Sequence, residues 1–236
     1  GALYLNTTGS QNTAVGYQAL YTPTTASNNT AIGYRANADN TSGTNNTAVG
    51  HESLRLSSTG SYNTAVGTGA LDSNTTADAN TAVGNGALGA NTTGASNTAV
   101  GSGALDANTT ASNNTAVGVD ALGTNTTGTE NVAVGDDSLK GNTTASYNTA
   151  IGHGAGESIT TGASNCIMGS RAGDAITTGA SNTIIGQGAA SVGSEMDDNV
   201  IIGVTAGYNG NSVHFNKNVA VGNRSMYSIV DAKESV

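Results

Sequence analysis

Residues 80–96 read Asn-Thr-Ala-Val-Gly-Asn-Gly-Ala-Leu-Gly-Ala-Asn-Thr-Thr-Gly-Ala-Ser, and this unit recurs with small changes along the chain. Its opening pentad, or a close variant, begins thirteen times, and each first residue is called slot 1 here: Asn12, Asn29, Asn46, Asn63, Asn80, Asn97, Asn114, Asn131, Asn148, Asn165, Asn182, Asn199 and Asn218. Successive copies are 17 residues apart, and the last follows after 19. Such a period indicates a repeat architecture, in which each copy is one unit that stacks on the next.

The composition excludes several classes of protein. Charged residues make up 10% of the 236 residues, against about 25% in ordinary globular domains. The seven Lys and Arg residues form no cluster, so a nucleic-acid interface is excluded, and no apolar run is long enough to predict a membrane span. A single cysteine cannot form a disulfide framework. We expect no catalytic, cofactor-binding or metal-binding residues, and we predict that the protein is not an enzyme.

The repeat predicts a fold made of short β strands. Gly, Asn and Thr are poor helix formers, and strands separated by Gly and Asn turns fit the unit better. We therefore predict an all-β parallel β-solenoid, a β-roll or β-helix of about thirteen 17-residue coils, over residues 1–226. Slots 2–4 are expected to form one strand and slots 8–14 to contain a second, with positive φ at slot 5 Gly and slot 1 Asn. Residues 227–236 are expected to be a C-terminal cap or the lead into a following neck or domain.

Stacking places equivalent residues about 4.8 Å apart, so the thirteen slot-1 asparagines are expected to form a structural amide ladder down one edge. Slot 9 changes from Leu to Gly in the two repeats whose slot 12 is Ile, which indicates that both slots border one interior space of constant volume. The residues that we assign to the core lie in slots 4, 9 and 12: Val15, Val49, Val83, Val117, Leu71, Leu105, Leu122, Ile159 and Ile176.

The third slot predicts self-association. In a strand, slots 2 and 4 share one face and slot 3 points the other way. Slot 3 is Ala or Ile in every copy, which is not expected of a face open to water. We assign this face to contacts between identical chains in a homotrimer, the alternative being a tight Ala contact within one chain. The residues assigned to the inter-chain face are Ala48, Ala82, Ala116, Ile167, Ile184 and Ile201.

The unit Asn-Thr-Ala-Val-Gly-x-x-Ala resembles the repeats of trimeric autotransporter adhesin heads, which form left-handed parallel β-rolls. It resembles still more the Asn-Thr-Ala-(Val/Ile)-Gly…Ala-Leu…Asn-Thr-Thr-Gly repeats of phage tail fibres, over essentially residues 1–226. The resemblance implies a trimeric, rigid shaft in a virion or on a bacterial cell surface. Such a shaft positions a receptor-binding tip and joins other tail or surface-appendage proteins. It implies no catalytic residues.

Two other functions stay open. A bacterial surface adhesin head could bind host or glycan ligands directly, and exposed tyrosines are the candidate glycan contacts: Tyr17, Tyr21 and Tyr34. The Thr columns of slots 13 and 14 could instead present regular hydroxyl arrays to ice.

The other chemically reactive residues are expected to be structural or solvated. We expect Asp136, Asp137, His51 and His153 on the solvated surface, and Cys166 as a buried inert thiol. The recurring Asn-Thr-Thr triplets match the glycosylation sequon, but the period alone explains them.

Overall fold

The computed structural model describes residues 1–208 and 216–226, so the expected cap at 227–236 lies outside the described residues. Among the described residues no helix is long and apolar enough to span a bilayer. The strands are β1 Thr13–Val15, β2 Thr30–Ile32, β3 Thr47–Val49, β4 Thr64–Val66, β5 Thr81–Val83, β6 Thr98–Val100, β7 Thr115–Val117, β8 Val132–Val134, β9 Thr149–Ile151, β10 Cys166–Met168, β11 Thr183–Ile185, β12 Val200–Ile202 and β13 Val219–Val221. The chain divides into two compact units, residues 1–114 with β1–β6 and residues 115–236 with β7–β13.

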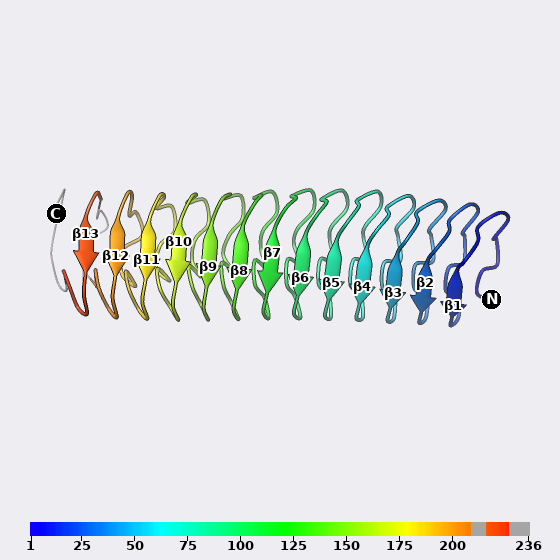
Figure 1. The fold of residues 1–236 in the computed structure, drawn as a ribbon, viewed down its shortest axis with the longest axis horizontal. Helices are drawn as coiled ribbons and strands as arrows, with labels where there is room; N and C mark the ends of the chain where they lie inside the picture. The colour runs from blue at the N-terminus through cyan, green and yellow to red at the C-terminus, as the bar shows by residue number, and fades with distance from the viewer. Residues whose placement is uncertain (209–215, 227–236) are drawn as a thin grey trace. The chain divides into compact units, whose positions relative to one another are not determined.

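Within each unit the strands lie side by side in one parallel sheet (Figure 1). Each slot pairs with the same slot of the next repeat, as when Ala48 pairs with Ala65 in the first unit and Ile167 with Ile184 in the second. The longer final repeat keeps this register, because Val200 still pairs with Val219. The predicted parallel β-solenoid is therefore confirmed.

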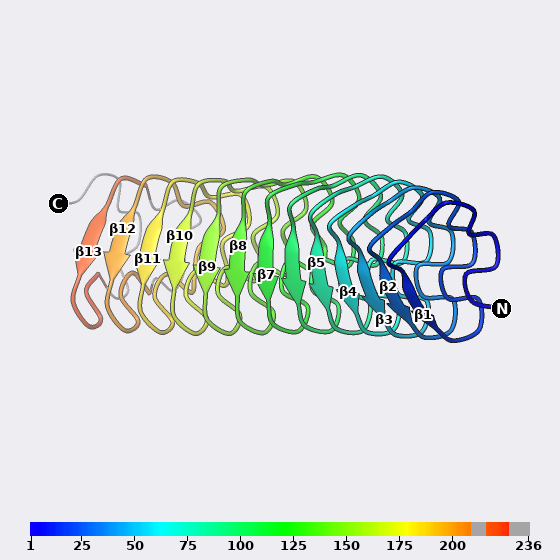
Figure 2. The ribbon, with the colours of Figure 1, turned by 45° about the vertical axis from the view of Figure 1, so that its right-hand side comes forward.

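In residues 1–208 and 216–226 each coil shows one strand, and the rest of the described backbone is mostly turns and bends (Figure 2). The expectation of a second strand in slots 8–14 was wrong, because slots 7 and 9 adopt the left-handed conformation, which interrupts an extended backbone. Asp120 and Leu122 illustrate this, with φ of 52° and 51°. The residue with positive φ before each strand is in slot 17, as in Asn113 (φ 63°), rather than in slot 1 as expected.

In most of the coils that the structure describes in full, slots 3, 8, 9, 12 and 15 fill the interior. The leucines of slot 9 are fully buried, and so are Ile159 and Ile176 of slot 12. A Cβ added at Gly156, in slot 9, would lie 3.1 Å from the Cδ1 atoms of both Ile159 and Ile167. Isoleucines of slots 3 and 12 therefore fill the space that a slot-9 leucine fills in other repeats.

The expected roles of slots 3 and 4 are reversed in the structure. The residues assigned to the inter-chain face lie inside their own coils and are at most 1% exposed: Ala48, Ala82, Ala116, Ile167, Ile184 and Ile201. The slot-4 residues assigned to the core lie on the outward face of the strands: Val15, Val49, Val83 and Val117. Val15 is 58% exposed. Because the slot-9 leucine already fills the narrow interior, the small slot-3 side chain fits inside and the larger slot-4 side chain does not.

The slot-1 asparagines form the predicted ladder, but within the coil and not along an exposed edge. In the first unit, Asn80 Nδ2 donates to the Gly94 carbonyl (2.9 Å), and Asn80 Oδ1 accepts the Asn97 backbone N–H (2.9 Å). In the second unit, Asn148 makes the same two bonds, to Gly162 and Asn165, each at 2.9 Å. Each amide thus closes its own coil and binds the next one.

A second ladder, in slot 12, was not anticipated, although the regular Asn there was its signal. Asn108 Nδ2 donates to Asn91 Oδ1 (2.9 Å), and Asn91 Nδ2 donates to the Gly94 carbonyl (2.9 Å). These asparagines begin the Asn-Thr-Thr triplets and are fully buried, which removes their amides from modification in the folded protein: Asn74, Asn91, Asn108, Asn125 and Asn142.

Asn37 is an exception within the slot-9 column. It replaces the Leu found in the adjacent repeats, is fully buried, and has no hydrogen-bond partner for either polar atom of its side chain. A buried amide without partners costs about 1–3 kcal/mol. We expect Asn37→Leu to raise the free energy of unfolding by about that amount, because it removes the unpaired amide and restores the leucine column.

Asn40, in the same coil, is the matched control. It is also fully buried, but its Nδ2 donates to the Gly43 carbonyl (3.0 Å) and its Oδ1 accepts the Gly43 N–H (2.7 Å). Asn40→Leu should therefore lower stability. Urea denaturation followed by circular dichroism measures both changes, and a loss of stability in both variants would contradict this account.

Candidate functional site

The outward face of the strands, formed by slots 2 and 4, is a regular surface of each unit, and we call it the strand strip. In the first unit it consists of Thr13, Thr30, Thr47, Thr64, Thr81, Thr98, Val15, Ile32, Val49, Val66, Val83 and Val100. In the second unit it consists of Thr115, Val132, Thr149, Cys166, Thr183, Val200, Val219, Val117, Val134, Ile151, Met168, Ile185, Ile202 and Val221. All these side chains are half-buried or exposed.

The strand strip is uncharged, and it pairs an apolar column in slot 4 with a Thr-rich column in slot 2. Slot 4 is Val, Ile or Met in all thirteen copies, and slot 2 is Thr, Val or Cys. Charged side chains occur almost entirely in slots 6, 7, 10, 11, 16 and 17, which lie off the strands. Because pairing is in register, each slot forms a straight column spaced by about 4.8 Å. Such a surface can bury apolar side chains against a flat partner.

Cys166 lies within the strand strip, in slot 2 of β10. The expectation of a buried thiol was wrong, because slot 2 points outward, and Cys166 is a free, exposed cysteine. Met168, in slot 4 of the same strand, is 44% exposed.

The three tyrosines considered for glycan binding belong to two ladders of aromatic rings in the first unit. Tyr17 stacks on Tyr34 (centroids 5.5 Å apart), and Tyr34 stacks on His51 (5.1 Å). Tyr21 stacks separately, on Tyr4 (5.2 Å). Because the ring faces contact one another, a sugar ring would meet mainly the ring edges and the ends of the ladders.

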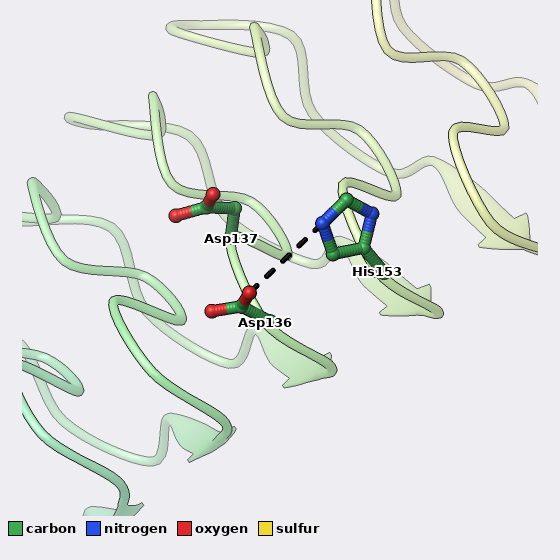
Figure 3. A group of neighbouring side chains, drawn as sticks. All are labelled: Asp136, Asp137 and His153. Atoms are coloured by element: carbon green, nitrogen blue, oxygen red, sulfur yellow. Dashed lines mark ion pairs between the residues drawn. The ribbon is translucent and has the colours of Figure 1, made fainter.

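One group of side chains in the second unit has the composition of a metal site (Figure 3). Asp136 and Asp137 follow β8, and His153 follows β9 in the next coil; His153 Nε2 lies 3.9 Å from Asp136 Oδ2. However, Lys140 Nζ binds Asp137 (2.8 Å) and Asp120 (3.1 Å), and these bonds raise the pKa of Lys140. The ammonium group partly neutralises the acidic pair that a cation would need, and the aspartates and His153 are half-buried or exposed. The arrangement matches a solvated surface.

The Thr column of slot 13 is used within the solenoid. Thr75 Oγ1 donates to the Thr92 carbonyl (3.1 Å), and Thr92 Oγ1 donates to the Thr109 carbonyl (3.0 Å). The same bond recurs in the second unit, where Thr143 donates to Thr160 (3.1 Å). These slot-13 hydroxyls stabilise the stacking of coils, whereas the slot-14 threonines considered with them for ice binding, such as Thr144 and Thr161, are exposed.

Comparisons with protein-family models, with curated proteins and with solved structures gave no match.

Proposed function

We propose that this chain is a structural shaft, a rigid spacer of a phage tail fibre or a trimeric surface adhesin that holds a receptor-binding tip away from the virion or cell surface. The observation that carries the proposal is the identical coil-to-coil bonding of successive repeats. Asn80 in the first unit and Asn148 in the second offer the same amide contact to the next coil, and adjacent strands pair slot to slot, so each added repeat extends the stack without a new kind of interface. The localisation that follows is the virion or the bacterial cell exterior.

The shaft is proposed to be a homotrimer. An outward sheet face without charge, and with an apolar residue in every copy of slot 4, favours burial against other protein over permanent contact with water. Closed rotational symmetry lets identical chains cover this face on one another. Measurement of the mass in solution by light scattering tests this part of the proposal.

Excision of one repeat tests the spacer role. Deletion of residues 80–96 joins Ala79, in slot 17, directly to Asn97, in slot 1, and leaves every later residue in its own slot. We expect the variant to fold and its maximum dimension, measured by small-angle X-ray scattering, to fall by about 5 Å. The control deletion of residues 80–87 breaks the register, so this variant should be strongly destabilised. Unfolding after the 17-residue deletion, or equal tolerance of both deletions, would refute the role.

Direct glycan binding is the second candidate function, and the aromatic ladders favour it. Tyr17 is 61% exposed, and the ladder to which it belongs has open ring edges. A glycan array probed with the wild-type protein and with Tyr17→Ala tests this function, and equal binding by both proteins would exclude a role for this ladder.

A further inference from the structure

We infer that the strand strip is the surface on which copies of this chain pack, in parallel and in register, so that each residue of the strip meets the same residue of the neighbouring copy. This inference rests on the proposed homotrimer and adds the contact face, the relative direction and the register. It also replaces slot 3, which the structure places inside the coil, by slots 2 and 4.

The first argument is chemical. Of the two faces of each strand, slot 3 is covered by its own coil, whereas slot 4 remains half-buried or exposed although it is never polar in thirteen copies. The protein has a net charge of −9, so two copies repel each other wherever their acidic slots meet. The strand strip carries no charge, and copies can approach there without that repulsion.

The second argument is geometric. The columns of the strip repeat every 4.8 Å or so, and side chains interlock along such a surface only if the partner has the same spacing. Another copy of this chain has that spacing. A parallel arrangement also places the Thr-rich strands beside Thr-rich strands and the more apolar β10–β13 beside their equivalents.

Cys166 reports on this arrangement. A symmetry axis that runs along the stacking direction keeps every residue at its own height, so the exposed thiols of neighbouring copies come close together. An antiparallel arrangement would place Cys166 opposite a different repeat. We expect a short bis-maleimide, to which each thiol adds across one C=C bond, to link two chains of each trimer, while the third chain takes a single adduct.

The control for cross-linking is the double variant Cys166→Ser, Thr161→Cys. Thr161 is exposed and lies in slot 14 of the preceding repeat, outside the strip. It should give no covalent dimer on a denaturing gel. If Thr161→Cys cross-links and the wild-type protein does not, the chains associate through another face, and the homotrimer stands while this inference falls.

A charge placed on the strip gives an independent test. The double variant Val134→Lys, Met168→Lys should convert the trimer to a monomer in light scattering, whereas Thr144→Lys, Thr161→Lys, which adds the same charge at exposed slot-14 positions, should remain trimeric. Unchanged far-UV circular dichroism would show that the outward lysines leave the coil folded.

A trimeric strip variant would overturn the inference. A monomeric wild-type protein would overturn both this inference and the proposed homotrimer. If that monomer also showed thermal hysteresis, the strand strip would instead be an ice-binding surface. The repeat-excision result for the spacer role is unaffected by either outcome.

Discussion

Gly84→Ala should lower the free energy of unfolding by more than about 4 kcal/mol, whereas Gly86→Ala should lower it by only about 1–2 kcal/mol. Gly84, in slot 5, has φ of 141°, and a Cβ there would clash with the carbonyl oxygen of Gly101 and lie 2.6 Å from its carbon. The clash is with backbone of the next coil, so it cannot be relieved by a rotamer change. Backbone strain adds about 1–3 kcal/mol.

Gly86 is the matched control in the same repeat. Its φ of 66° is in the ordinary left-handed region, and an added Cβ would meet only Asp106 Oδ1, at 3.8 Å. The same slot holds Arg35 and Glu52 in other repeats, at φ of 51° and 54°, so side chains are tolerated there. Urea denaturation and hydrogen exchange of β5 and β6 measure the difference. Equal effects of the two substitutions would contradict the close approach of adjacent coils at slot 5.

Asn80→Asp should lower the free energy of unfolding at pH 7 by about 3–5 kcal/mol, because it places an unpaired charge in the buried ladder. The amide group donates to the Gly94 carbonyl through Nδ2 and accepts from Asn97 through Oδ1. A carboxylate keeps the second bond and turns the first into a contact between two oxygens. Burial and this contact raise the pKa of the introduced carboxyl group above its value of about 3.9 in the unfolded chain.

The pH dependence of this variant has a definite sign. Because the folded state holds the proton more tightly than the unfolded state, the defect is smallest below pH 4 or so and grows as the pH rises through the folded-state pKa. The protonated side chain can donate its O–H to Gly94, as the amide did. The control Asn85→Asp, at an exposed slot-6 position, should change stability by less than about 0.5 kcal/mol at either pH. A stability defect in Asn80→Asp that does not vary with pH would contradict the assigned bonds.

The sequence predicted the period, the stacking, the slot-1 ladder and the strand in slots 2–4, since all of these follow from residues that recur at fixed spacing; the second strand that it predicted in slots 8–14 is absent from the described residues. It did not predict which strand face lies inside. Alternation shows only that slots 2 and 4 lie on the face opposite to slot 3. Which of the two faces points inward depends on the interior volume that Leu122 and the other slot-9 leucines leave free. The left-handed backbone of those same leucines was also not predictable, because Leu has no preference for positive φ (51° in Leu122).

The orientation of the strand also decides two residues of the candidate site. The sequence predicts a buried Cys166 and an inter-chain Ala48, whereas slot 2 points outward and slot 3 inward, so Cys166 is exposed and Ala48 is buried in its own coil. The tyrosine ladders were not predicted, because stacking of Tyr17 on Tyr34 depends on the in-register columns that the structure shows.

The amide of Asn80 binds its own coil through Nδ2 and the next coil through Oδ1, and Asn148 in the second unit does so in the same way. A gene that encodes such a unit can gain or lose whole copies by unequal recombination between its tandem segments, and the product still folds at each step. Under the proposed spacer role, natural selection can therefore adjust the length of the stack by changing copy number alone, with no compensating point mutations elsewhere.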